Sequence, residues 1–186
     1  MEVNTCVDNI EFKTYSGQEL LDAKFATREF LVEGLMRERD SIILCADPKV
    51  GKSLLSLQLA MCMTTGEPFL DDYMIRRPCN VLYIACEGEL SDWQDRIVRM
   101  SKTIAFDPKR FKLMYSAPLS LQKGHADLDI KIALAYAEDK GEYKKIDMIF
   151  IDSLYMSIVG GSMSNDECVI GYVASIREIK SLYECA

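Results

Sequence analysis

Short apolar runs alternate with longer helical patterns along the chain, which is typical of stacked βαβ units. The runs of strand length are residues 41–46, 80–86, 111–116 and 146–151. The helical patterns are residues 52–65, the segment after Trp93, residues 126–140, and residues 164 to about 183. The predicted fold class is therefore α/β, a mostly parallel sheet with helices on both faces.

Local signals refine three of these segments. The helix over residues 52–65 is apolar on nearly every side, which is typical of a helix sandwiched in a core, and Gly66 is placed to cap it. Ser91 begins a capping-box spacing. Residues 1–40 are mixed and acidic with some helical periodicity, and we interpret them as a lead-in segment to a domain over residues 41–186.

Composition narrows the class of protein. An apolar fraction of 49% with 27% charged residues is globular and excludes a disordered chain. No apolar run approaches the roughly 18 residues that span a bilayer, so we expect no membrane association. The seven cysteines contain no C-x-x-C pair, which predicts small core residues in a reducing, cytoplasmic compartment. A net charge of −7 lacks the global basic charge of many nucleic-acid binders.

The segment that carries chemistry lies between the first predicted strand and the apolar helix. It reads Ala46-Asp47-Pro48-Lys49-Val50-Gly51-Lys52-Ser53 and continues into Leu54. This is the pattern of a phosphate-binding P-loop, with Ala46 where glycine is usual. Backbone N–H groups and the helix N-terminus attract phosphates, and Gly51 lets the backbone approach closely. We predict that residues 46–54 bind ATP, with Lys52 on the outer phosphates and Ser53 ligating Mg²⁺; a chance G-K-S is the alternative.

A carboxylate follows the last predicted strand. Asp152 stands at the carboxyl end of residues 146–151, and ligands of parallel sheets bind beyond the carboxyl ends of the strands. We therefore expect Asp152 and Ser53 to face the same crevice and to hold Mg²⁺, the Walker B arrangement. The alternative is an aspartate that only begins a turn.

Two further acids follow the strand over residues 80–86. Glu87 or Glu89 could polarise the water that attacks the γ-phosphate, which is general-base chemistry. Many P-loop ATPases keep an acid directly after the Walker B aspartate, but Ser153 stands there. Glu87 is the first choice for the base, Glu89 the second, and the alternative is a pair of solvated loop acids.

The order of these motifs resembles a known family. The segments that carry the resemblance are Phe30-Leu31-Val32-Glu33-Gly34-Leu35-Met36, Pro48-Lys49-Val50-Gly51-Lys52-Ser53, Thr65-Gly66-Glu67-Pro68-Phe69-Leu70, Val81-Leu82-Tyr83-Ile84-Ala85-Cys86-Glu87-Gly88 and Ile151-Asp152-Ser153-Leu154-Tyr155. From about residue 28 onward the chain is similar to RecA-like ATPases related to the hexameric plasmid helicase RepA. The resemblance implies a RecA-like fold, water activation by Glu87, magnesium binding through Asp152, a hexameric ring of identical subunits, and action on single-stranded DNA.

Three functions remain open from the sequence. They are a ring-helicase or translocase motor, a regulatory or recombination-type ATPase that does not unwind DNA, and a small-molecule kinase. Residues 156–166, where the resemblance implies DNA contact, contain no Lys or Arg. RecA-like sheets place one more strand between the Walker A and Walker B strands, and the sequence ends soon after Tyr183 without it. We therefore expect either an ATPase core that is incomplete at its C-terminus, with that position open, or an N-terminal segment or a partner that fills the position.

Overall fold

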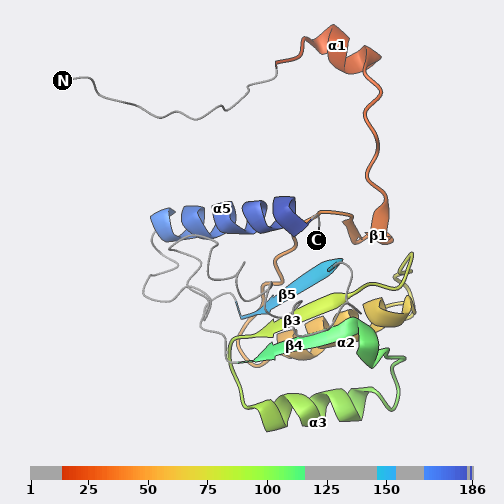
Figure 1. Cartoon of the computed structure of the whole chain (residues 1–186), viewed down its shortest axis with the longest axis vertical. Coiled ribbons are helices and arrows are strands. Elements are labelled where there is room, and N and C mark those ends of the chain that lie inside the picture. The colour runs from red at the N-terminus through yellow and green to blue at the C-terminus, as the bar shows by residue number, and fades with distance from the viewer. Residues whose placement is uncertain (1–13, 116–145, 154–165, 184, 186) are drawn as a thin grey trace, which may run out of the picture.

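The computed structural model describes residues 14–115, 146–153, 166–183 and 185 (Figure 1). The elements in chain order are α1 (Gly17–Asp22), β1 (Phe30–Val32), β2 (Met36–Arg37), α2 (Lys52–Thr65), β3 (Val81–Ala85), α3 (Leu90–Met100), the 3₁₀ helix η1 (Pro108–Arg110), β4 (Phe111–Tyr115), β5 (Met148–Asp152) and α5 (Asp166–Tyr183). None of the described helices is both long and apolar enough to cross a bilayer.

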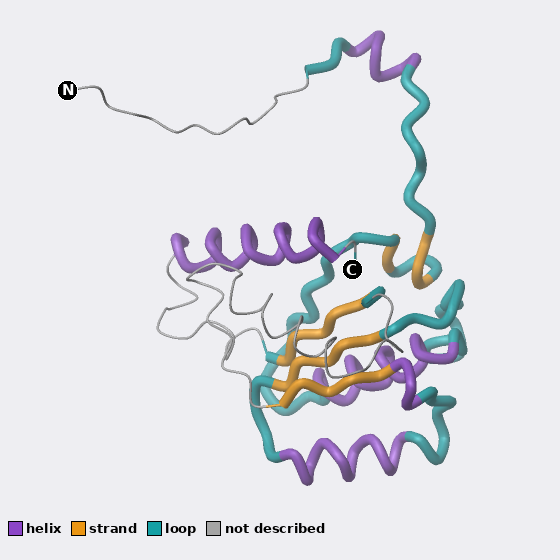
Figure 2. Tube along the Cα trace, viewed as in Figure 1, coloured by secondary structure: helices purple, strands orange, loops and turns teal. Residues whose placement is uncertain are grey.

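The main sheet is parallel, as the sequence predicts. Its strand order is β4-β3-β5, with β3 in the centre. Val81 pairs with Phe111 on one side and with Met148 on the other, and Ala85 pairs with Tyr115 and with Asp152. The three strands therefore end together at one edge, where the predicted acidic residues follow. Figure 2 shows α5 on one side of the strands and α3 on the other.

Burial of both faces of β3 explains its uninterrupted apolar sequence. All of its residues are buried. Alternate side chains point to opposite faces of a strand. Val81, Tyr83 and Ala85 accordingly join the core formed with α2 and Trp93. Leu82 and Ile84 belong to a second core with Ile179 of α5.

The predicted strand over residues 41–46 is wrong. Residues 41–47 form no regular element, and Ile42, Ile43 and Leu44 expose 52%, 67% and 49% of their surface. A strand needs a hydrogen-bonded neighbour, and among the described residues β5 pairs with β3 alone. The expectation of an open position beside the Walker B strand stays a prediction.

Helix α2 has the predicted bounds and the predicted cap. Gly66 adopts the left-handed conformation with φ 81°, and its N–H donates to the Cys62 carbonyl. The expectation that α2 is sandwiched on every side is wrong, because Leu54 and Leu55 remain 49% and 37% exposed. That side of the helix faces the residues that fail to form the first predicted strand, as the shared hollow described below shows.

Other local expectations have mixed outcomes. The predicted capping box at Ser91 is wrong. Helix α3 already begins at Leu90, and its N-cap is Glu89. Among the described residues 14–40, helix is limited to Gly17–Asp22, and Phe30–Val32 forms a strand whose hairpin packs into the main core. The predicted helix over residues 126–140 lies outside the described residues.

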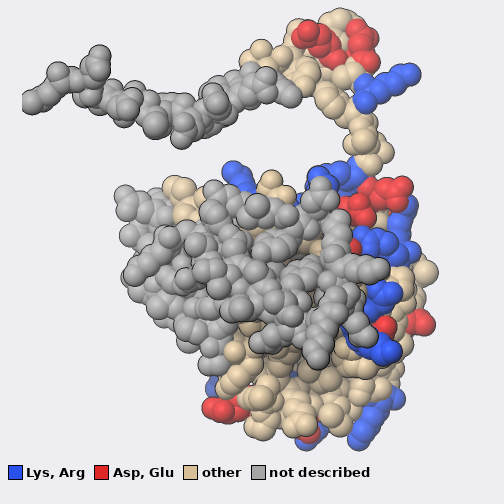
Figure 3. All heavy atoms as spheres, viewed as in Figure 1, with Lys and Arg blue, Asp and Glu red and all other residues tan. Residues whose placement is uncertain are grey.

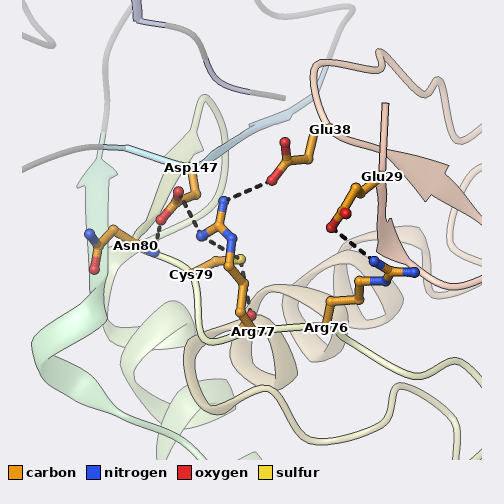
Figure 4. Close-up of polar contacts among 7 residues, drawn as sticks. All are labelled: Glu29, Glu38, Arg76, Arg77, Cys79, Asn80 and Asp147. Carbon is orange, nitrogen blue, oxygen red and sulfur yellow. Dashed lines mark hydrogen bonds and ion pairs between the residues drawn. The ribbon is translucent and has the colours of Figure 1, made fainter. Parts of the chain in front are cut away.

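A polar cluster ties this hairpin to the amino ends of β3 and β5 (Figure 4). Arg77 donates through Nη1 to Oδ1 of Asp147 at 2.9 Å and lies 3.3 Å from Oε1 of Glu38 through Nη2. The other oxygen of Asp147 accepts the backbone N–H of Asn80 at 2.8 Å. In the face that Figure 3 shows, basic side chains in this region lie among acidic ones, so the positive charge is locally compensated.

Candidate functional site

The acidic candidates meet at the carboxyl edge of the sheet. Asp152 is the last residue of β5 and pairs with Ala85 of β3. One residue further, the backbone N–H of Cys86 donates to the Asp152 carbonyl at 2.6 Å. Glu87 follows directly and is exposed. Parallel pairing therefore brings the start of the Glu87 loop beside Asp152, although the two acids are 65 residues apart in the numbering.

The P-loop is an exposed turn that closes on its own lysine. The Lys52 ammonium donates to the carbonyl of Ala46 at 2.8 Å and to that of Asp47 at 2.6 Å. Gly51 is the N-cap of α2 with φ 98°, a left-handed conformation that favours glycine. Ala46 is not among the described residues that adopt a positive φ. Its Cβ therefore fits this loop without backbone strain. The usual glycine is therefore dispensable at position 46.

A hollow of about 430 Å³ adjoins the loop. Its lining joins the P-loop, the exposed side of α2 and the end of α3, and consists of Leu44, Ala46, Val50, Gly51, Lys52, Leu54, Leu55, Gln58 and Met100. The lining is mainly apolar apart from Lys52 and Gln58. Lys52, at the start of α2, is the charged residue of this lining. Leu54, which the sequence analysis included in the nucleotide-binding segment, is thus a wall of the hollow.

The Asp152 side chain is held by a buried tyrosine. The Tyr83 hydroxyl donates to Oδ2 of Asp152 at 2.8 Å and lies 2.7 Å from Oγ of Ser56 on α2. Burial, and then the charge of Asp152, raise the pKa of Tyr83 well above its usual range. The phenol therefore stays protonated and remains a hydrogen-bond donor to the carboxylate.

The Glu87 loop is held by a buried tryptophan. The indole N–H of Trp93 donates to the Glu87 carbonyl at 3.0 Å, and Trp93 is 1% exposed. Gly88 turns the chain between them with φ 89°. A Cβ on Gly88 would lie 3.3 Å from Nε1 of Trp93. The loop therefore has a fixed backbone although the Glu87 carboxylate itself faces solvent.

The remaining candidates lie on the P-loop, on α2 and at the start of α3. Ser53 is half-buried in the first turn of α2, and that helix contacts β5. Glu89, the second choice for the base, is exposed and serves as the N-cap of α3 without a side-chain cap bond. Lys49 adopts a positive φ of 63° at the exposed tip of the P-loop.

Sequence reasoning missed the residues that support the acids. In the sequence, Trp93 only begins a helical pattern, and Tyr83 is only part of an apolar strand. A signal was nevertheless present, because buried Tyr and Trp place their O–H and N–H against a partner. A tyrosine in the middle of a fully apolar strand is therefore a candidate donor to whatever polar group ends the neighbouring strand.

The residues at this edge fit a magnesium ion that arrives with a nucleotide. A serine hydroxyl and a carboxylate are oxygen ligands of the kind that Mg²⁺ prefers, and Mg²⁺ usually completes its octahedron with waters and phosphate oxygens. Within the described part of the chain, no group of three or more His, Cys, Asp or Glu side chains gathers to hold a metal. Ser53 and Asp152 suit an ion whose other ligands are phosphate and water.

Comparison with known proteins identifies a family. A family model described as AAA domain matches residues 6–186, which is nearly the whole chain. No curated protein and no solved structure matches the chain.

Proposed function

The chain belongs to the AAA domain family of P-loop ATPases, and on that premise we propose that it binds and hydrolyses Mg·ATP as a RecA-like motor domain. Residues 46–54 bind the phosphates, Ser53 and Asp152 hold the magnesium, and Glu87 is the general base. The observation that carries the proposal is that Asp152 and the start of the Glu87 loop lie together at the carboxyl edge of a parallel sheet whose strand β5 contacts the P-loop helix.

The P-loop supplies positive charge at a site that already suits anions. The Lys52 ammonium donates to two loop carbonyls. Phosphate oxygens carry negative charge, so they attract the ammonium more strongly than neutral carbonyl oxygens do. The N-terminus of α2 adds about half a positive charge beside them. ATP therefore draws Lys52 from the loop carbonyls onto its phosphates.

Glu87 and Asp152 have different tasks in this scheme. When bound, Mg²⁺ would offset the negative charge that develops on the phosphates during transfer, and Ser53 and Asp152 would hold it. Asp152 presents its carboxylate from the end of β5, with one oxygen fixed by Tyr83. Glu87 presents a solvent-facing carboxylate that can accept the proton of the attacking water. The Trp93 hydrogen bond holds the backbone from which that carboxylate projects.

The motor role rests on the resemblance to RepA-related ATPases. We assign the ATPase to a hexameric ring that unwinds or translocates along single-stranded DNA during replication in the cytoplasm. One observation favours the second candidate, a regulatory or recombination-type ATPase without unwinding: residues 156–166 contain no Lys or Arg for phosphate contact. Stimulation of ATP turnover by single-stranded DNA supports the motor, and unwinding of a forked duplex separates a helicase from a translocase.

The Glu87→Gln variant tests the hydrolytic assignment. Glutamine keeps the shape of the side chain and cannot accept a proton, so Mg·ATP binding should be retained while turnover falls by about 10²–10⁴-fold. Glu89→Gln is the matched control, because that acid is equally exposed and lies two residues away. If Glu89→Gln loses turnover and Glu87→Gln does not, the general base is Glu89.

A further inference from the structure

A chain of hydrogen bonds crosses the core from the P-loop helix to the candidate magnesium ligand. It runs from Ser56 of α2 through Tyr83 of β3 to Asp152 of β5, with donor–acceptor distances of 2.7 Å and 2.8 Å. Ser56 lies one helical turn after Ser53, and its Oγ is also 3.2 Å from the Ser53 carbonyl. The chain therefore joins the two elements that carry the proposed ligands of the ion.

The hydrogens in this chain have one consistent direction. An ionised carboxylate only accepts hydrogen bonds, and a phenol has a single hydrogen. Tyr83 must therefore donate to Asp152, and the bond between Tyr83 and Ser56 must use the serine hydrogen. The Ser56 hydroxyl thus donates to the phenol oxygen, at a shorter distance than its contact with the Ser53 carbonyl. Both hydroxyls point their hydrogens toward the carboxylate.

Packing fixes the Tyr83 ring. Its exposed fraction is 0%, it stacks on Phe150 with an interplanar angle of 13° and a centroid distance of 5.5 Å, and it lies 5.2 Å from the Trp93 ring. A ring enclosed in this way cannot swing to another rotamer without displacing its neighbours. The phenol oxygen is consequently held at one place relative to Asp152.

We propose that Tyr83 is a positioning residue whose buried hydroxyl sets the orientation of the Asp152 carboxylate for magnesium and links it to α2. The inference rests on the proposed function, because it takes Asp152 and Ser53 as the residues that hold the ion. With Oδ2 engaged by Tyr83, Oδ1 would be left for the ion or its water shell. Because the hydrogen bond already orders the Asp152 side chain, ion binding does not have to restrict its rotamers.

A purely structural hydroxyl would behave differently. Buried polar groups are generally hydrogen-bonded, so a contact with Asp152 could serve stability alone. In that case removal of the hydroxyl changes the free energy of unfolding and leaves the magnesium dependence unaltered. The two roles are therefore separated by a measurement of metal dependence at equilibrium, without reference to turnover.

The test is Tyr83→Phe in the whole chain, with a fluorescent ATP analogue as the probe. Phenylalanine keeps the stacked ring and removes only the hydroxyl. The Mg²⁺ concentration for half-maximal enhancement of analogue binding should rise about 10–100-fold, the usual effect of losing a partner of a metal ligand. Analogue affinity in excess chelator should stay within about twofold of the unsubstituted protein, because the P-loop is untouched.

Tyr73→Phe is the matched control. Tyr73 is 37% exposed and forms an antiparallel β-bridge with Phe69 in the segment between α2 and β3. It should leave both affinities unchanged. Ser56→Ala provides a second variant should Tyr83→Phe unfold, and it should raise the Mg²⁺ requirement in the same direction by a smaller factor.

Each outcome decides something different. If the unsubstituted protein binds the analogue with Mg²⁺ dependence and Tyr83→Phe matches it, the positioning role is overturned while the proposed function stands. If the unsubstituted protein shows no Mg²⁺-dependent binding, the proposed function fails and this inference fails with it. A raised Mg²⁺ requirement in Tyr83→Phe, with Tyr73→Phe unchanged, supports the inference.

Discussion

Substitution of Gly88 by alanine should damage catalysis through the loop that carries Glu87. Gly88 has φ 89°, a left-handed conformation that costs a residue with a Cβ about 1–2 kcal/mol. The new Cβ would also lie 3.3 Å from Nε1 of Trp93, closer than an ordinary van der Waals contact. Trp93 is 1% exposed, so it cannot move aside freely.

The contact falls on the atom that holds the loop. Nε1 of Trp93 donates to the Glu87 carbonyl at 3.0 Å, and a typical hydrogen bond contributes about 0.5–1.5 kcal/mol net. Added to the backbone term, Gly88→Ala should lower the free energy of unfolding by about 2–3 kcal/mol. Displacement of a catalytic group by 1 Å can cost about 10²-fold in rate, so a shift of a few tenths of an ångström should lower turnover about tenfold.

Gly34→Ala is the matched control. Gly34 also has a positive φ, 70°, but a Cβ there meets nothing within 4 Å. It should lose only the backbone term of about 1–2 kcal/mol and keep full turnover. Urea unfolding and steady-state ATP hydrolysis of both variants give the comparison. Equal turnover in the two variants would refute the claim that the Trp93 contact positions Glu87.

Two further predictions concern the amino ends of the strands. Asp147→Asn removes the ion pair with half-exposed Arg77, so the free energy of unfolding in urea should fall by about 1–2 kcal/mol. Glu38→Gln removes the more exposed ion pair with the same arginine, and here the fall should be less than about 1 kcal/mol. Burial, then the charge of Asp147, raise the pKa of the Cys79 thiol from 9.0 to about 12. Because the thiol holds its proton more tightly in the folded state, its full contribution to stability is present below the unfolded-state pKa of about 9. The free energy of unfolding should therefore decline as the pH rises from about 9 toward 12. Cys79→Ala should flatten that decline, and an unchanged slope would contradict it.

Much of the sheet could be predicted because its central strand is buried on both faces. An uninterrupted apolar run such as Val81–Ala85 has few alternatives once it is bounded by polar residues. The carboxyl-edge placement of Asp152 then follows from parallel pairing alone. The helix over Lys52–Thr65 and its glycine cap could also be predicted, because the end of the apolar run and the position of Gly66 indicate the same helix end.

The strand before the P-loop could not be judged from its own sequence. Residues 41–46 are as apolar as a buried strand, yet strand formation depends on a hydrogen-bonding neighbour that local sequence does not specify. Among the described strands none pairs with this segment, and Ile43 is 67% exposed. The exposed side of α2 has the same origin, because it lacks the packing that such a strand brings.

The supporting residues of the site were hidden for another reason. Tyr83 and Trp93 look like core residues because their rings are buried, and only the three-dimensional arrangement reveals what their polar atoms touch. Tyr83 donates to the carboxylate of Asp152, and Trp93 donates to the backbone carbonyl of Glu87. Hydrophobic patterning detects the ring of such a residue and is silent about its hydrogen bond.

The central claim is that residues 46–54 bind ATP phosphates through Lys52. The most direct test is equilibrium binding of a fluorescent ATP analogue to the unsubstituted chain, to Lys52→Ala and to Lys49→Ala. Lys49 is the matched control, because it is an exposed lysine of the same loop, and the proposal gives the loop residues other than Lys52 their phosphate contacts through backbone N–H groups, which Lys49→Ala keeps. The account predicts that Lys52→Ala binds the analogue at least about tenfold more weakly, in keeping with the loss of a charge-assisted contact, while Lys49→Ala stays close to the unsubstituted protein. Equal affinity in all three proteins, with the Lys52→Ala fold intact by circular dichroism, would contradict it.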